Sequence, residues 1–126
     1  MNLSPHFTLN ELTKTSVRTD NIAPPQVIEK LRKLCEYVLE PVRDEFGPVT
    51  VNSGYRSPAV NAAVGGSKSS QHMIGEAADF EIRGVSNHEV AVWIKDNLGQ
   101  YDQLILECYK PGGDPNAGWV HCSYVH

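Results

Sequence analysis

Two histidines and two carboxylates of the 126-residue chain could together hold a metal and move a proton: His72, Asp79, Glu107 and His121. Zinc in proteins accepts imidazole nitrogen and carboxylate oxygen, and a catalytic zinc site leaves one position open for water. The metal lowers the pKa of that water to about 7 and polarises a substrate carbonyl, while a nearby carboxylate moves the proton. These residue types therefore favour metal-assisted hydrolysis of a carbonyl substrate.

The strands that must position these residues are predicted at 77–82, 103–108 and 119–124. Side chains alternate across a strand, and each of these segments has one apolar face. The opposite faces carry Asp79, Glu107 and His121, while His72 lies in a polar loop just before the first of these strands. The alternation predicts one sheet surface for the three strand residues, but it does not give the order of the strands.

A long buried helix is predicted between two proline-containing boundaries. Apolar residues recur at three-to-four spacing from Val27 to Phe46, which indicates one buried helical face. Pro24-Pro25 opens this helix, Pro41 is expected to kink or split it, and Gly47-Pro48 ends it.

Shorter elements complete the expected fold. A strand is predicted at 49–53, and short helices at 9–14, 57–64 and 86–98, the last two beginning at serine N-caps. Together these elements predict an α+β fold in which helices pack on one face of a small, mainly antiparallel sheet. The chain length fits one domain, residues 1–126.

Composition argues against several classes of protein. The chain is 40% apolar and 21% charged with a net charge of −4 and no basic run, so no nucleic-acid partner is expected. No apolar stretch is long enough for membrane insertion, and the N-terminus lacks a secretory signal, which predicts cytoplasmic synthesis. Cys35, Cys108 and Cys122 form no Cys-x-x-Cys pair and are expected to be reduced.

Glu76 is expected to face solvent.

Three motifs follow one another along the chain. They are Ser53-Gly54-Tyr55-Arg56-Ser57 followed by Asn61, Ser70-Gln71-His72 followed by Gly75-Glu76-Ala77-Ala78-Asp79, and Trp119-Val120-His121. In order and spacing, over roughly residues 5–125, they resemble the motifs of the zinc D-Ala-D-Ala carboxypeptidases and L-Ala-D-Glu endopeptidases of the peptidase M15 family. The resemblance implies the Hedgehog/DD-peptidase fold, and the compact size is similar to that of phage or prophage members.

The resemblance also implies roles for individual residues. His72, Asp79 and His121 would bind one zinc ion per chain. Arg56 would be both a catalytic residue and a substrate-binding residue, because it would position the substrate. Ser70 would support the site through a hydrogen bond.

The implied substrate is the stem peptide of peptidoglycan, cut by zinc-activated water at its D-Ala-D-Ala end or at an internal bond. Trp119 would line the cleft for this substrate, or else be a buried aromatic residue. We expect the protein to be a monomer that acts on the cell wall. If a phage encodes it, we expect a holin to release it from the cytoplasm.

One position departs from the pattern of the family that the motifs resemble. Many members carry an acid three residues before the last histidine, where this chain has Gly118. Glu107 is expected to replace that acid as general base and then general acid, as a glutamate does at the end of the preceding strand in the Hedgehog-type arrangement. The alternation of side chains independently places Glu107 on the His121 face, and Asp114 is the alternative.

Two other functions stay open from the sequence. The Gly118 departure could indicate a zinc-containing module that binds cell wall or a virion component without catalysis. A metal-free structural domain, for example of a virion, is the third interpretation.

Overall fold

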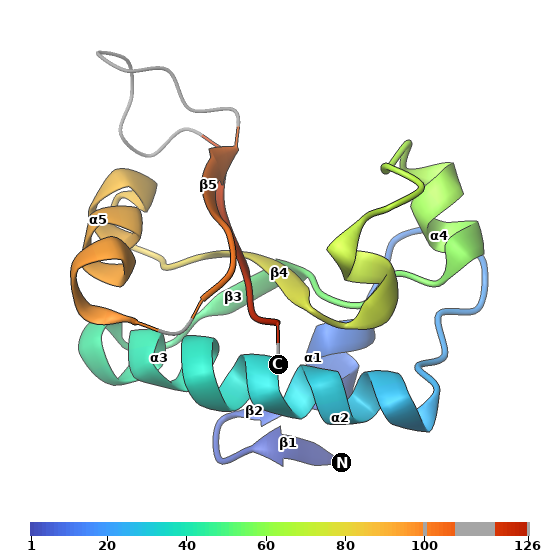
Figure 1. The fold of residues 1–126 in the computed structure, drawn as a ribbon, viewed down its shortest axis with the longest axis horizontal. Helices are drawn as coiled ribbons and strands as arrows, with labels where there is room; N and C mark the ends of the chain where they lie inside the picture. Colours follow the sequence, from blue (N-terminus) through green and yellow to red (C-terminus); the bar gives the residue numbers. More distant parts are fainter. Residues whose placement is uncertain (100, 108–117, 126) are drawn as a thin grey trace.

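The structure, a computed structural model, describes residues 1–99, 101–107 and 118–125. Its helical elements are α1 (Leu9–Thr13), α2 (Pro25–Leu34), the π-helix η1 (Cys35–Leu39), α3 (Glu40–Phe46), α4 (Pro58–Ala63), the 3₁₀-helix η2 (Gln71–Ile74) and α5 (Asn87–Asn97). Its strands are β1 (Asn2–Ser4), β2 (Phe7–Thr8), β3 (Thr50–Ser53), β4 (Ala77–Glu81), β5 (Leu104–Glu107) and β6 (Trp119–Ser123) (Figure 1).

Strands β3 to β6 form one sheet in the order β3-β4-β6-β5, and every neighbouring pair in it is antiparallel. The register pairs Phe80 with Val120 and Val120 with Leu106, which turn toward the hydrophobic core. Asp79 pairs with His121 in the same register, and their side chains lie on the opposite face of the sheet. The predicted α+β fold with an antiparallel sheet is confirmed.

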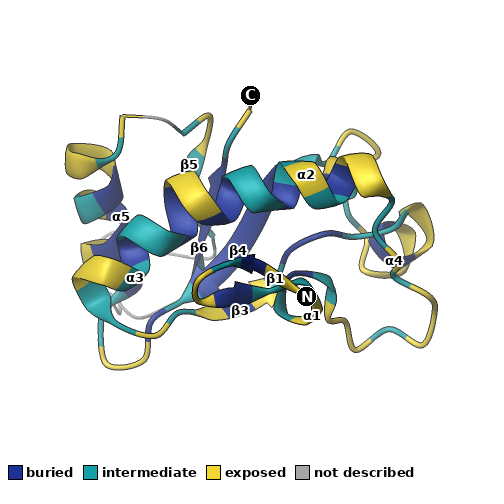
Figure 2. Ribbon diagram, turned by 90° about the horizontal axis from the view of Figure 1, so that it is seen from below, coloured by how far each residue is buried: buried dark blue, intermediate teal, exposed yellow. Residues whose placement is uncertain are grey.

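The core lies between this sheet and the long helical segment that runs from α2 through η1 to α3. Figure 2 shows the buried strands beneath this segment, whose outer side is exposed. Helix α5 adds Val90 and Ile94 to the same core. The serine caps are as predicted, because the hydroxyls of Ser57 and Ser86 accept the backbone N–H groups of Val60 and Glu89 in the first turns of α4 and α5. Among the described residues, no helix combines the length and apolar character needed to cross a membrane.

Pro41 changes the long helix in a different way from the predicted kink or break. The helix continues through Pro41, which lies in the first turn of α3, and the irregularity is the π-helical segment just before it. The Glu40 N–H donates to the carbonyl of Cys35, one residue further back than in an α-helix. Proline has no N–H to donate and its ring crowds the preceding turn, so a widened turn accommodates it.

The two free cysteines that the structure describes are buried, as expected for reduced thiols. Burial raises the pKa of Cys35 and of Cys122 to about 12, so neither is a reactive thiolate at neutral pH. Cys108 lies outside the described residues.

A carboxylate on the long helix holds the β1–β2 hairpin. The Ser4 hydroxyl and the His6 N–H donate to Glu40 Oε2 at 2.6 and 2.8 Å, and His6 Nδ1 lies 2.8 Å from Oε1. Partial burial would raise the pKa of Glu40, but the hydrogen bonds from Ser4 and His6 outweigh it and lower that pKa. Since the folded pKa lies below the unfolded one, the contribution to stability is present above the unfolded pKa and is lost as the pH falls through the folded pKa.

The substitution Glu40→Gln should therefore lower the free energy of unfolding by about 1–3 kcal/mol at pH 7, because it removes a charged acceptor of several hydrogen bonds. The difference from the parent protein should shrink as the pH falls through the lowered folded pKa of Glu40, where the carboxylate itself becomes protonated. Urea denaturation at several pH values measures both effects. Glu36→Gln, at an exposed position of η1, is the matched control, and equal losses in the two variants would contradict the assignment.

Candidate metal centre

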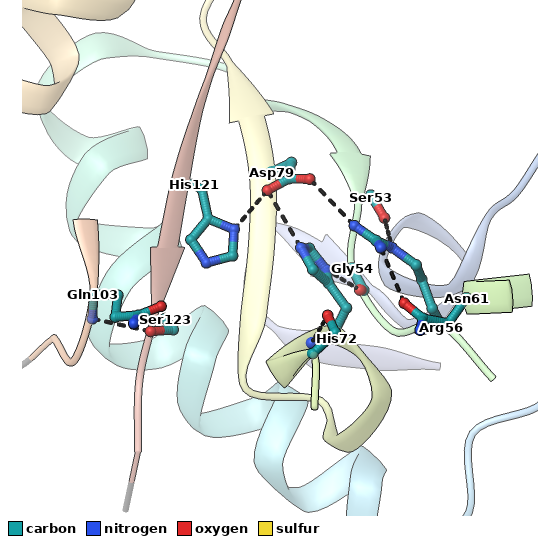
Figure 3. A network of polar contacts seen from close by, with 10 residues as sticks. Ser53, Gly54, Arg56, Asn61, His72, Asp79, Gln103, His121 and Ser123 are labelled. Atoms are coloured by element: carbon teal, nitrogen blue, oxygen red, sulfur yellow. Dashed lines mark hydrogen bonds and ion pairs between the residues drawn. The ribbon is translucent and has the colours of Figure 1, made fainter. Parts of the chain in front are cut away.

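Three side chains from separate segments meet on the polar face of the sheet. The register of β4 and β6 sets Asp79 beside His121, and η2 brings His72 to the same place (Figure 3). His121 Nδ1 lies 2.9 Å and His72 Nε2 lies 3.3 Å from Asp79 Oδ1. One potential ligand atom from each of the three residues lies within 4.8 Å of the other two.

This cluster fits a zinc ion in both chemistry and size. Two imidazoles and one carboxylate are a donor set that zinc accepts in catalytic sites. With bonds of 2.0–2.1 Å in a tetrahedron, zinc ligands lie about 3.3 Å from one another, so these side chains need to move little. All three are buried, with His72, Asp79 and His121 only 3%, 7% and 9% exposed, so few waters compete for the donors.

A backbone contact fixes the orientation of the His72 ring. His72 Nδ1 lies 2.7 Å from the carbonyl oxygen of Gly54. A carbonyl only accepts, so Nδ1 must carry the proton and donate it. Nε2 is thereby directed at Asp79 and is the ring nitrogen left to bind a metal, which is the usual arrangement behind a metal-binding histidine.

The turn that carries His72 is held at both ends. The Ser70 hydroxyl accepts the His72 N–H at 3.2 Å and caps η2. Gly75 ends η2 with a φ of +80°, and a side chain there would collide with Val27 of α2. His72 was expected in an irregular loop, but it lies in this short helix, which limits the positions that its ring can adopt.

Asp79 stays ionised at the centre of the cluster. Burial alone would raise the pKa of Asp79, but the hydrogen bonds and charges of His121 and His72 outweigh it and hold the pKa at about 2. The carboxylate is therefore in the form that a metal requires at neutral pH.

Arg56 lies next to Asp79, in the loop between β3 and α4. Its Nη2 is 3.6 Å from Asp79 Oδ2, while Nε donates to the Ser53 hydroxyl and Nη1 to the side-chain oxygen of Asn61. The Arg56 N–H also donates to the carbonyl of His72 at 2.9 Å. These contacts hold the guanidinium beside the cluster, with its side chain 16% exposed.

Gly54 is a residue of the site that sequence reasoning had not singled out. It supplies the carbonyl for His72, and its own backbone lies so close to Leu12 that any side chain would collide with that residue. The glycine between Ser53 and Tyr55 was the available signal, but the need for it depends on a contact with a distant helix.

Glu107 lies on the face predicted for it. It pairs with Trp119 in the β5–β6 register, and Trp119 and His121 share one face of β6. Glu107, Ile105 and His121 line a cleft of about 320 Å³ together with Ser70. Trp119 is half-buried and is not among the described residues that line this cleft.

Gly118 has a backbone conformation that accounts for a glycine at this position. Its φ is +70°, in the left-handed region that other residues rarely adopt, and its carbonyl accepts a hydrogen bond from Asn87 at 2.9 Å. An acid at this position would strain the turn. Asp114, the alternative to Glu107, lies outside the described residues.

The expectation that Glu76 faces solvent is wrong. Its side chain is buried and pairs with Lys30 of α2 at 2.9 Å. The turn at Gly75 directs Glu76 toward the long helix, and strand alternation alone does not predict this direction.

Comparison with known proteins relates the chain to a family and to a named relative. The sequence profile of the family described as Peptidase M15 matches residues 5–123. A segment of 44 residues is 49% identical to the zinc D-Ala-D-Ala carboxypeptidase of Streptomyces albus G. This segment is 33% of the present chain and covers only 17% of the length of that relative.

The metal centre makes a direct prediction. Zinc should stabilise the metal-free protein by about 2.7 kcal/mol at a free concentration one hundred times its dissociation constant, because it binds the folded state. His121→Ala removes one of three donors and should abolish most of that zinc-dependent rise in melting temperature. His88→Ala, in the first turn of α5, should keep the full rise. An undiminished zinc effect in the His121 variant would place the metal elsewhere.

Proposed function

The chain belongs to the peptidase M15 family, and we propose that it is a zinc metallopeptidase that hydrolyses peptide bonds in the stem peptides of peptidoglycan. The observation that carries the proposal is the buried cluster of His72, Asp79 and His121, with the ring of His72 fixed by a backbone carbonyl. The name of the Streptomyces relative, a zinc D-Ala-D-Ala carboxypeptidase, supports both the metal and the substrate class. The chain would act on the cell wall with one zinc ion, as a monomer.

Each residue of the centre has a role in this proposal. His72, Asp79 and His121 would hold zinc, which when bound supplies a Lewis acid for the scissile carbonyl and lowers the pKa of water. Glu107, in the cleft beside His121, would take a proton from the attacking water and pass it to the leaving amine. Glu107 lies at the end of β5, opposite Trp119 in the register and on the same face of the sheet as His121.

Arg56 would hold the substrate while it reacts. Its guanidinium is anchored to Asp79, Ser53 and Asn61, so it offers substrate a donor of fixed position. A guanidinium binds a carboxylate through two parallel hydrogen bonds. Ser70 would act through η2, and Trp119 would support Glu107 from the neighbouring strand.

Gly118 favours a second candidate, a zinc-containing module that binds cell wall or a virion component without cutting it. In this case the metal cluster would serve stability, and Glu107 would have no catalytic task. The two candidates predict the same zinc content and differ in the effect of purified protein on peptidoglycan.

Glu107→Gln should leave zinc content unchanged and lower the rate of cleavage at least about 100-fold, because an amide cannot accept the proton. Mass spectrometry of digested peptidoglycan measures the rate and also identifies the bond, either the terminal D-Ala-D-Ala bond or an internal one. Glu81→Gln, on β4 and outside the cleft, is the matched control. Cleavage by the Glu107 variant at the parent rate would show that Glu107 is not the general base. A parent protein that binds zinc but cuts nothing would favour the binding module.

A further inference from the structure

A second pocket opens on the other side of Arg56, away from Glu107. Its volume is about 200 Å³, and its walls include Lys14, Thr15 and Ser16 after α1, Ser53 and Arg56 at the end of β3, and Val64 at the end of α4. The pocket therefore shares Arg56 with the candidate metal centre, where that side chain lies 3.6 Å from Asp79.

The charges of this pocket differ from those elsewhere on the surface. Two cationic residues, Lys14 and Arg56, line it with several hydroxyls and no acid. Four other pockets in the described part of the chain each include at least one carboxylate, and the chain as a whole carries a net charge of −4. A concave site with cations and hydroxyls and without acids selects an anion.

The backbone of Lys14 is held in place relative to Arg56. Lys14 directly follows α1, whose last turn is tied to the Arg56 loop because the Tyr55 N–H donates to the carbonyl of Leu12 at 2.7 Å. The Asn21 amide donates to the carbonyl of Tyr55 at 2.9 Å and to the end of α1 at 2.7 Å. Within the described residues Lys14 forms no ion pair, so its charge is available to a ligand.

Arg56 has donors left for the same ligand. A guanidinium carries five N–H groups, and the contacts with Ser53, Asn61 and Asp79 engage one group on each nitrogen. Each terminal nitrogen therefore keeps a further N–H, and the side chain remains partly exposed.

We propose that Lys14 and Arg56 together form a subsite for a free carboxylate on the amine side of the bond that is cut. The inference rests on the proposed peptidase function and deepens it by naming the substrate group and a new specificity residue, Lys14. The cleft on the other side contains Asp102 and Glu107, which repel a carboxylate. Opposite charges on the two sides thus fix the direction in which a peptide lies across the metal centre, while Val64 offers an apolar contact for a small side chain next to the carboxylate.

The test compares two synthetic stem pentapeptides with the zinc-loaded protein. One has the free carboxylate on the amine side of the cleaved bond, and the other has a carboxamide there. Lys14→Gln should raise KM for the free acid about three- to tenfold with little change in kcat, an effect that weakens at high salt, and should leave the amide unaffected. Lys14→Arg should restore the KM, and Lys95→Gln, an equal change of charge on α5, should have no effect.

Binding of the same two peptides, measured by calorimetry, separates this inference from the proposed function. If the parent protein cleaves neither peptide, the peptidase proposal fails, but a preference for the acid that depends on Lys14 still supports the subsite. If Lys14→Gln weakens acid and amide equally, or weakens neither, the carboxylate subsite is wrong whatever the catalytic activity.

Discussion

The pairing of Asp79 with His121 across two antiparallel strands is the constraint on which the rest of the site depends. The same register sets Phe80 against Val120 on the core side, where the long helix packs. A slip of one residue in β4 or β6 would turn Asp79 or His121 into the core and expose the apolar residues of that strand. The same strand register is therefore required for core packing and for the geometry of the metal centre. Burial of the core offsets the free energy that it costs to bury the polar groups of the cluster.

Much of this arrangement could be predicted from the sequence, because strand alternation and helix caps are local patterns. They place Glu107 on the His121 face and begin α4 and α5 at the correct serines. The rest depends on contacts between distant segments. The contact between the Gly54 carbonyl and His72 joins residues 18 positions apart, and the ion pair of Glu76 with Lys30 joins residues 46 positions apart. The order of the strands likewise has no local sequence pattern.

Electrostatics divide the site around Asp79. On one side, Arg56 extends the cluster toward a cationic pocket, and on the other, the cleft of Glu107 is acidic. Asp79 contacts His72 and His121 of the centre and Arg56 of the loop, and its pKa is low because its interactions with the two histidines outweigh its burial. The same carboxylate that would bind a metal thus also fixes the residue that would bind the substrate, so the two functions share one anchor.

The left-handed backbone at Gly118 has a consequence for how such a site can evolve. The turn is held by Asn87 through the glycine carbonyl, and a side chain at this position would be strained. Placing an acid at position 118 would thus require the turn to be rebuilt, while Glu107 already lines the cleft from the neighbouring strand β5. In the proposed peptidase, the two placements of the acid would be separated by an epistatic barrier, so that a lineage with this turn would keep its acid on β5.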